Sequence, residues 1–173
     1  SCPVGFKNGT DGSVKVAADA VLAAQARHAF MGMTKMGQGA IFQTRGNDDG
    51  HIILRGGRKP NSSEADVDAA CRQLAASGLR EQVMVDLSHA NSRKQHRRQP
   101  DVGAELAARI AAGDTGLTGA MMESQLYEGR QDIVPGQPLQ YGVSVTDACI
   151  SLAQTLPLLE QLAQAVLQRR QRA

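Results

Sequence analysis

Four side chains suited to chemistry each follow a short apolar run. His89 comes soon after the run Val83–Val85, while Lys7, Arg55 and Glu123 follow similar runs. In parallel α/β proteins, functional groups lie at the carboxyl ends of buried strands, where several strands meet at one edge. The repeated layout therefore predicts one site that combines cationic, imidazole and carboxylate groups.

Lys7 and Arg55 offer the chemistry of an anion site. An arginine presents a planar fork to phosphate or carboxylate, whereas a lysine acts as a point charge. Gly56 and Gly57 follow Arg55 and would let backbone N–H groups approach an anion closely. For one such residue a surface ion pair is the simpler interpretation, but two at equivalent strand ends favour an anion site.

His89, Glu123 and Asp147 form a second candidate set. One imidazole and two carboxylates suit Mn²⁺, Fe²⁺ or a similar divalent ion better than structural zinc. From spacing alone, a hydrogen-bonded histidine and two helix-capping acids are the simpler interpretation, because Asp147 falls within a helical pattern. Asp86 and Ser88 are candidates to orient the metal ligands.

Alternating strand and helix patterns would position these groups. Apolar runs predict strands at residues 3–6, 28–33, 51–54, 83–87 and 117–122, with a further small strand at 40–43 in a hairpin decoration. Helical patterns cover residues 14–26, 62–77, 100–112 and 144–150, and a last helix begins at Pro157. Asn61 and Glu64 have the spacing of a capping box.

This alternation is typical of parallel strands joined by crossover helices. Two architectures fit, an open doubly wound sheet and part of a (β/α)8 barrel. No Gly-x-Gly-x-x-Gly pattern follows a strand, and Gly9–Gly12 is not a Walker loop. A nucleotide-binding doubly wound fold is therefore the less favoured of the two.

The composition indicates one globular domain. The chain has 173 residues, of which 42% are hydrophobic, and a net charge of +2. The small charge and the scarcity of aromatic residues (3%, no Trp) disfavour nucleic acid as a partner. The basic segment Arg93–Arg98 is interpreted as a solvated helix start, the alternative being contact with a phosphorylated ligand or nucleic acid. No apolar run reaches the ~20 residues of a membrane span.

The cysteines and the first residues indicate the cellular location of the chain and its relation to a longer protein. Cys2, Cys71 and Cys149 are widely spaced and form no CxxC pair, which predicts reduced thiols and a cytoplasmic location. No signal-peptide pattern is visible. The chain opens directly on a strand pattern without Met, so we expect it to be part of something longer.

Five motifs resemble one enzyme family. They are SCPVGFKNGTDG (1–12), HIILRGG (51–57), DLSHAN (86–91), MES (122–124) and YGVSVTDAC (141–149). Together they resemble the feedback-regulated class I type of 3-deoxy-D-arabino-heptulosonate 7-phosphate (DAHP) synthase, over a span from Ser1 to about Arg170. That family is a (β/α)8 barrel of about twice this length. The resemblance implies that residues 1–173 are the C-terminal part of one barrel domain, covering roughly its last five β/α units, with the N-terminal strands absent.

The resemblance also implies an activity, the first step of the shikimate pathway of aromatic amino acid biosynthesis. Phosphoenolpyruvate condenses with D-erythrose 4-phosphate, phosphate is released, and a divalent metal such as Mn²⁺ or Fe²⁺ is required. Lys7 and Arg55 match catalytic residues that contact the carboxylate and the phosphate of phosphoenolpyruvate. His89, Glu123 and Asp147 match three of four metal ligands. His89 is also expected to be catalytic, and Asp147 also matches a contact to the sugar phosphate.

Some ligand-binding residues of the family have no counterpart in this sequence. The family's fourth metal ligand is a cysteine on the first barrel strand, and further basic contacts lie on other early strands. This chain alone is therefore expected to be inactive, with an exposed apolar edge where the barrel would close. The alternatives are a noncatalytic anion-binding or assembly remnant, and the related octulosonate 8-phosphate synthase, which the motifs fit less well.

Ser1, Phe30 and Gly32 match positions of the family's effector pocket. Gly32 is as in the tyrosine-sensitive type, whereas the phenylalanine-sensitive type usually has serine there. An aromatic amino acid effector is therefore expected, with tyrosine as the prediction. The full-length protein is expected to be a homo-oligomer.

Overall fold

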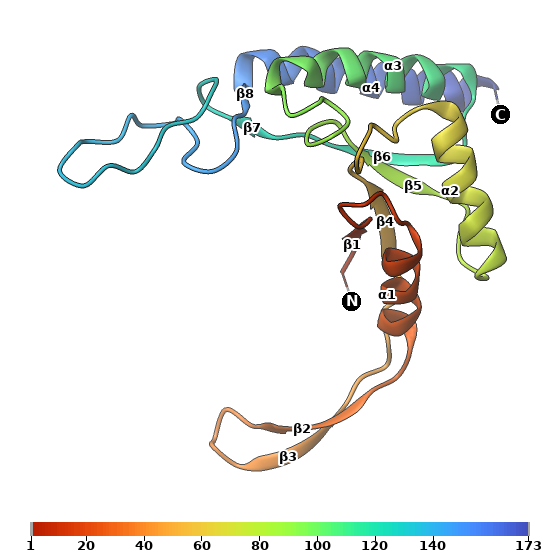
Figure 1. Cartoon of the computed structure of the whole chain (residues 1–173). Coiled ribbons are helices and arrows are strands. Elements are labelled where there is room, and N and C mark those ends of the chain that lie inside the picture. Colours follow the sequence, from red (N-terminus) through yellow and green to blue (C-terminus); the bar gives the residue numbers. More distant parts are fainter. Residues whose placement is uncertain (1, 173) are drawn as a thin grey trace.

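The computed structural model describes residues 2–172 and has a parallel sheet at its centre. Four strands lie in the order β1-β4-β5-β6, and every neighbouring pair is parallel. They are β1 (Val4–Lys7), β4 (Gly50–Leu54), β5 (Val83–Asp86) and β6 (Leu117–Met121). Figure 1 shows helices between successive strands, as parallel connections require. The predicted α/β class with parallel strands is confirmed.

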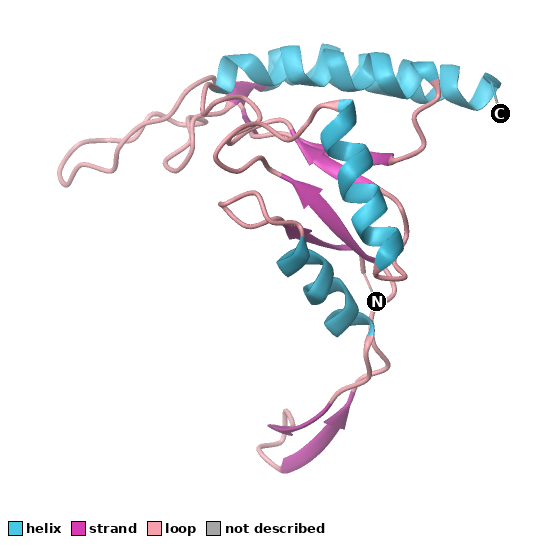
Figure 2. Ribbon diagram, turned by 45° about the vertical axis from the view of Figure 1, so that its right-hand side comes forward, coloured by secondary structure: helices cyan, strands magenta, loops and turns pink. Residues whose placement is uncertain are grey.

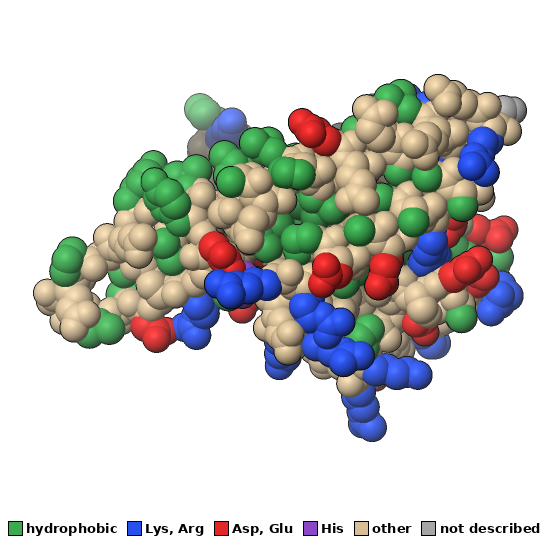
Figure 3. Space-filling view, turned by 90° about the horizontal axis from the view of Figure 1, so that it is seen from above, with side chains coloured by type: hydrophobic (Ala, Val, Ile, Leu, Met, Phe, Trp, Pro, Cys, Tyr) green, Lys and Arg blue, Asp and Glu red, His purple; other side chains and the backbone are tan. Residues whose placement is uncertain are grey.

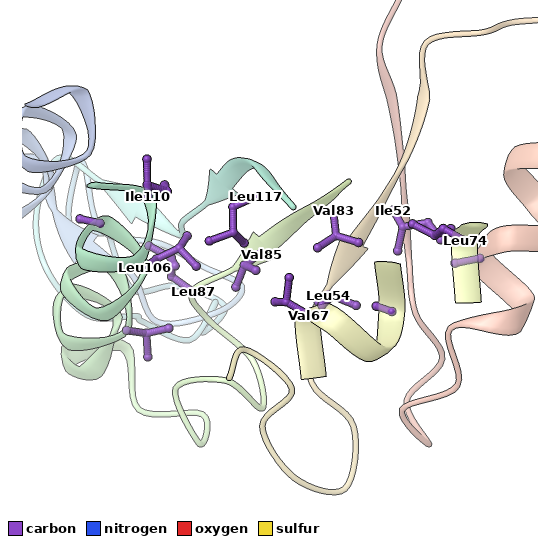
Figure 4. Close-up of a cluster of buried hydrophobic side chains, with 14 of the residues drawn as sticks. Ile52, Leu54, Val67, Leu74, Val83, Val85, Leu87, Leu106, Ile110 and Leu117 are labelled. Carbon is purple, nitrogen blue, oxygen red and sulfur yellow. The ribbon is translucent and has the colours of Figure 1, made fainter. Parts of the chain in front are cut away.

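The crossover helices pack on the sheet and form the core with it. They are α1 (Lys15–Gln25), α2 (Glu64–Ala76) and α3 (Gln99–Ala112). Figure 4 shows the buried aliphatic side chains where these layers meet, from α2, α3 and the strands: Ile52, Leu54, Val67, Leu74, Val83, Val85, Leu87, Leu106, Ile110 and Leu117. Burying each one contributes about 1.5–3 kcal/mol. The core therefore holds the carboxyl ends of the strands in a fixed frame.

Helix α2 begins later than the predicted capping box. Ser63, not Asn61, is the N-cap, and its hydroxyl accepts a hydrogen bond from the Asp66 N–H. The side-chain oxygen of Asn61 instead accepts from the backbone N–H of Gly56 at 2.6 Å. The predicted cap is wrong because the loop after β4 already engages that side chain.

The chain beyond β6 differs most from the prediction. β7 (Ser124–Gln125) pairs in parallel with β8 (Ile150–Ser151), and α4 (Leu152–Arg172) follows. The helix predicted at residues 144–150 is wrong: Ile150 is buried, and its N–H donates to the backbone carbonyl of Glu123 at 3.0 Å. The central sheet therefore has four of the predicted strands, and β7 and β8 form a separate two-stranded parallel sheet after it.

Helix α4 does not begin at Pro157. The hydroxyl of Ser151 accepts a hydrogen bond from the Gln154 N–H, and Pro157 lies inside the helix. Proline removes one helical hydrogen bond, but here α4 packs tightly on α3. A Cβ on Gly103 of α3 would lie 2.5 Å from Leu158 Cδ1, so the glycine permits this close packing.

A hairpin extends away from the sheet. It consists of β2 (Ala29–Met33) and β3 (Gly39–Gln43), which pair antiparallel (Figures 1 and 2). The predicted hairpin decoration is confirmed, but the strand at 28–33 belongs to it and not to the parallel sheet. Its large apolar side chains are exposed, including Phe30, Met31, Met33 and Ile41.

Residues 126–149 form a second extension, which we call the arm. It leaves the sheet between β7 and β8 (Figure 1), and Figure 3 shows apolar side chains gathered on it. The exposed ones include Leu126, Tyr127, Ile133, Val134, Leu139 and Tyr141. β1 pairs with β4 alone among the described residues, and its Val4 is exposed, so this edge of the sheet is open as predicted.

Two further predictions concern single features of the described chain. Cys2, Cys71 and Cys149 form no disulfide among the described residues, and the reduced state of these thiols stays a prediction. Within residues 2–172, every helix is too short or too polar to cross a membrane.

Candidate metal and anion site

The three predicted metal ligands converge at the carboxyl edge of the sheet. His89 follows β5, Glu123 follows β6, and Asp147 lies in the arm just before β8. Each offers one ligand atom, and these atoms all lie within 4.8 Å of one another. His89 Nε2 is 3.7 Å from Glu123 Oε1. The helical context that argued against Asp147 is absent, because its segment is not a helix.

Asp147 reaches the cluster because the arm folds back on itself. Gly129 and Cys149 exchange backbone hydrogen bonds in both directions, at 2.9 and 3.1 Å. The thiol of Cys149 lies 3.4 Å from the carbonyl oxygen of Asp147. These contacts close the arm near its base and place Asp147 over the ends of β5 and β6.

The loop after β5 holds His89 in an uncommon backbone conformation. His89 has a φ of 53°, and Arg93 and Lys94 are left-handed too, with φ of 54° and 59°. Such conformations cost about 1–3 kcal/mol each in residues other than glycine and cluster at functional sites. The Lys94 N–H donates to the His89 carbonyl at 2.7 Å, which closes the turn.

A buried carboxylate lies beneath His89. Asp86 is 0% exposed, and its Oδ2 is 2.8 Å from His89 Nδ1 and 3.2 Å from Lys7 Nζ. Its Oδ1 accepts hydrogen bonds from the backbone N–H and the hydroxyl of Ser88, at 2.9 and 2.6 Å. The two predicted orienting residues therefore lie on the Nδ1 side of the ring, while Glu123 lies on the Nε2 side.

Three asparagines tie the strand-end loops together. Asn8 accepts from the Arg55 N–H at 2.8 Å and donates to the Gly56 carbonyl at 2.9 Å. Asn91 donates to the carbonyls of Leu54 and Asp86, and its side-chain oxygen accepts from the backbone N–H of Asn61. Sequence reasoning missed this network. Its signal was an asparagine soon after a strand in both the FKN and the SHAN motif.

The anion-binding candidates lie at the same edge. Arg55 lines a pocket of about 440 Å³ together with Gly56, Gly57 and His89. Gly56 has a φ of 75°, and a Cβ there would lie 2.5 Å from the Cβ of Ala90. The loop backbone thus passes so close to its neighbour that only glycine fits. Arg55 and His89 share one cavity, as the layout of the sequence predicts, whereas Lys7 is not among the residues that line it and its Nζ lies 3.2 Å from Asp86 Oδ2.

Glu123 is held from behind by a buried glutamine. The side chain of Gln99 accepts from the Glu123 N–H at 2.8 Å and donates to its carbonyl at 3.1 Å. Burial raises the pKa of the Glu123 carboxyl, the nearby Asp147 adds to the rise, and His89 opposes it. Without a cation, the raised pKa means that the Glu123 carboxyl ionises less readily. A bound cation would stabilise the ionised carboxylate and so oppose this rise.

The basic segment after β5 has two parts. Residues His96–Arg98 form a short 3-10 helix that leads into α3, which agrees with the predicted helix start. Lys94 and His96, however, line the same pocket as His89. Glu128 of the arm accepts from His96 Nε2 at 2.9 Å and from Arg97, which fixes the arm against this segment.

Two of the predicted effector residues lie on the hairpin. Phe30 stacks on Phe42 across the strands, with ring centroids 5.8 Å apart. A Cβ on Gly32 would lie 2.8 Å from the Phe42 ring. Ser1 lies outside the described residues. The structure therefore groups Phe30 and Gly32 around one aromatic pair, on a different element from the pocket.

The cluster of His89, Glu123 and Asp147 fits a divalent ion by its chemistry. One imidazole nitrogen with carboxylate oxygens is a set that Mn²⁺ and Fe²⁺ accept. The carboxylate of Asp86 on the other ring nitrogen is the arrangement usual at metal-binding histidines. Arg55 and the glycine loop adjoin this cluster, so a cation and an anion could be held side by side.

Comparison with known proteins gives a consistent result. Residues 1–160 match the model of the DAHP synthetase I family. The chain is 54% identical to the Phe-sensitive phospho-2-dehydro-3-deoxyheptonate aldolase of Escherichia coli K12, and 52% identical to the Trp-sensitive one of Enterobacter agglomerans. Each alignment covers 98% of this chain and 49% of the relative.

The solved structures agree. The aldolase of the same name from Francisella tularensis SCHU S4 superposes with a TM-score of 0.89 at 45% identity, covering 98% of this chain and 49% of that one. The chain thus spans about half the length of the relatives it matches. These names do not favour the octulosonate alternative. Motifs, fold and comparisons lead to one conclusion: the chain belongs to the DAHP synthetase I family.

Proposed function

We propose that this chain carries the metal-binding and anion-binding part of a DAHP synthase. The reaction joins phosphoenolpyruvate and D-erythrose 4-phosphate, consumes water and releases phosphate. The observation that carries the proposal is the convergence of His89, Glu123 and Asp147 within 4.8 Å in a pocket that Arg55 also lines. Family membership at more than half identity supports it.

The proposed architecture is a (β/α)8 barrel of which this chain supplies the last five β/α units. Further strands would attach at β1, which pairs with β4 alone among the described residues, and at β8, which pairs with β7 in a separate two-stranded sheet. A closed barrel would bring more side chains to the same carboxyl edge. The activity is therefore proposed for the complete barrel, and the chain alone is expected to release no phosphate. A cytoplasmic location and a homo-oligomeric state stay predictions.

The metal would be held by His89 Nε2 and the carboxylates of Glu123 and Asp147. When bound, a divalent ion supplies Lewis-acid polarisation of the aldehyde oxygen. Gln99 fixes the backbone of Glu123, and the closed arm fixes Asp147, so both carboxylates are in place before substrate arrives. Such preorganisation lowers the reorganisation needed during reaction.

The anion-binding residues would orient phosphoenolpyruvate. Arg55 would grip its phosphate and Lys7 its carboxylate, so that the methylene carbon faces the aldehyde carbon. The new carbon–carbon bond forms between these two atoms. Water then adds to the former enol carbon. The bond from this carbon to the phosphate oxygen breaks, phosphate leaves, and the oxygen from water loses its protons and becomes the ketone oxygen. Asp147, at the exposed side of the cluster, would also meet the sugar phosphate substrate.

A hybrid enzyme tests the proposal. Residues 1–173 would replace the matching half of the Escherichia coli Phe-sensitive relative, and phosphate release would be measured with Mn²⁺. We expect an active hybrid whose turnover falls at least about 100-fold with Arg55→Ala. Arg58→Ala, an exposed arginine three residues on, is the matched control and should leave turnover unchanged. A folded, Mn²⁺-binding hybrid without phosphate release would contradict the proposal.

The effector is proposed to be an aromatic amino acid, with tyrosine favoured by Gly32. The named relatives are Trp-sensitive and Phe-sensitive, which supports the class of effector but not the choice among the three. Titrating the hybrid with each amino acid decides the choice. Inhibition by phenylalanine without any response to tyrosine would contradict the prediction.

A further inference from the structure

The ring of His89 has two nitrogens with different surroundings. Nε2 faces Glu123 Oε1 at 3.7 Å, whereas Nδ1 lies 2.8 Å from Asp86 Oδ2 and 2.7 Å from Ser88 Oγ. A neutral imidazole carries its hydrogen on one nitrogen and a lone pair on the other, and a metal binds the lone pair. The tautomer therefore decides whether Nε2 can be a ligand.

The hydrogens around Asp86 determine that tautomer. A carboxylate only accepts, so the hydrogen in the 2.6 Å contact between Ser88 Oγ and Asp86 Oδ1 comes from the hydroxyl. Ser88 Oγ then has no hydrogen left to donate and can only accept from the ring. Both neighbours of Nδ1 are thus acceptors. Nδ1 carries the hydrogen, and Nε2 presents its lone pair to Glu123 and the pocket.

The surroundings hold this arrangement in place. Asp86 is 0% exposed, and within residues 2–172 its Oδ2 has no hydrogen bond of regular geometry. Burying a carboxylate without an opposite charge is strongly unfavourable, and Lys7 Nζ at 3.2 Å supplies that charge. His89 itself has a left-handed backbone conformation, with a φ of 53°.

We propose that Asp86 is a positioning residue that sets the tautomer of His89 and so makes Nε2 available as a metal ligand. This inference rests on the proposed metal-binding role of His89. It adds that a buried carboxylate, acting from the far side of the ring and touching neither metal nor substrate, determines whether that role is possible.

Asp86→Asn tests the inference in a nearly isosteric way. The backbone N–H of Ser88 still needs an oxygen at the Oδ1 position, so the amide nitrogen takes the place of Oδ2 and donates to His89 Nδ1. The ring hydrogen then moves to Nε2. We expect imidazole ¹⁵N shifts at about pH 8.5 to report Nδ1–H in the parent and Nε2–H in the variant. Mn²⁺ affinity should fall about 10- to 100-fold.

Two control variants distinguish a specific effect of Asp86 from a general effect of substitution on the structure. Ser88→Ala should keep the Nδ1–H tautomer, because the negative charge of Asp86, with Oδ2 2.8 Å from Nδ1, still favours a hydrogen on that nitrogen. Asp114→Asn removes a 2.6 Å ion pair with Arg109 at the opposite end of the sheet and should change neither tautomer nor Mn²⁺ affinity. The chain has four histidines, so the His89 signal is assigned by its loss in His89→Gln, and the others serve as references.

The outcomes are decisive either way. An Nε2–H tautomer in the parent overturns the inference without any variant, which keeps the test valid should Asp86→Asn fail to fold. An Asp86→Asn protein with unchanged tautomer and Mn²⁺ affinity also overturns it. A parent that shows the expected tautomer and its switch but binds no Mn²⁺ supports positioning by Asp86 and overturns the proposed metal site instead.

Discussion

The carboxyl edge of the sheet and the β2–β3 hairpin are built in opposite ways. At the edge, polar side chains are buried and bonded: Asn8 is 2% exposed, Asn91 3%, and Asp86 and Gln99 0%. The hairpin relies on backbone pairing and one aromatic stack, and Met31 on it is 84% exposed. We therefore expect the proposed site to be held in place before any ligand binds, and the hairpin to tolerate substitutions at little cost to the stability of the fold.

The largest effect should come from cutting the buried network. Asn91→Ala removes the donor to the carbonyls of Leu54 and Asp86 and leaves these buried carbonyls without that hydrogen bond. We therefore expect the free energy of unfolding to fall by about 2–4 kcal/mol. Asn47→Ala is the control, since its bond to the Cys2 carbonyl is exposed, and should cost less than about 1 kcal/mol. Urea unfolding measures the free energy of unfolding of both variants. Equal losses would contradict the view that the buried network at the carboxyl edge stabilises the fold more than an exposed hydrogen bond does.

Two glycines with nearly the same φ allow the packing of the site loop to be compared with that of the hairpin. Gly56 at the site has a φ of 75°, and a Cβ added to it would lie 2.5 Å from the Cβ of Ala90. Gly37 at the hairpin tip has a φ of 77°, and a Cβ added there would meet nothing within 4 Å among the described residues. Gly37→Ala should cost about 1 kcal/mol from backbone conformation alone. Gly56→Ala should cost about 2 kcal/mol more because of the clash. Thermal unfolding that ranks the two equally would contradict a tightly packed site loop.

The pH dependence of stability is a third test of the edge. Burial raises the folded-state pKa of Glu123 above its ordinary value of 4.5, so the folded chain holds that proton more tightly than the unfolded chain. The stability from this group is full below the unfolded pKa and is lost as pH rises through the raised folded pKa. Glu123→Gln cannot ionise and should lose less stability than the parent over this window. Urea unfolding at several pH values with EDTA measures the difference, and parallel curves would refute it.

The smallest effect on stability is expected on the hairpin. Gly32→Ser places a Cβ 2.8 Å from the Phe42 ring, which must move, but the ring is partly exposed and free to do so. We expect less than about 1 kcal/mol of destabilisation. In the hybrid enzyme, the same change should alter which aromatic amino acid inhibits. A large loss of stability would mean that the hairpin is less independent than the structure implies.

Sequence alone located the functional groups better than it located their surroundings. Lys7, Arg55, His89 and Glu123 were predictable because each follows an apolar run that becomes a strand. Asp147 could not be placed, because its position depends on the Gly129–Cys149 pairing, which joins residues far apart in the chain. A local pattern cannot report such a contact.

The secondary structure, too, was predictable where the local pattern is strong and not where distant contacts decide it. Strands of four or five residues with helices between them carry strong periodic signals and were predicted. β8 has only two residues, and Ile150 is held by the distant carbonyl of Glu123, so a helical pattern was assigned there in error. The N-cap of α2 was misplaced for a similar reason, since the better local candidate, Asn61, is engaged by Gly56.

Mn²⁺ binding to the chain tests the proposed metal site at His89, Glu123 and Asp147. Electron paramagnetic resonance of free Mn²⁺ would count bound ions in the parent, in Glu123→Gln and in Glu128→Gln. Glu128 is the control, because it is a nearby carboxylate engaged with His96 and Arg97 and outside the three-residue cluster. We expect one bound ion in the parent and in Glu128→Gln, and its loss in Glu123→Gln. Equal binding by all three proteins would contradict a metal site at His89, Glu123 and Asp147.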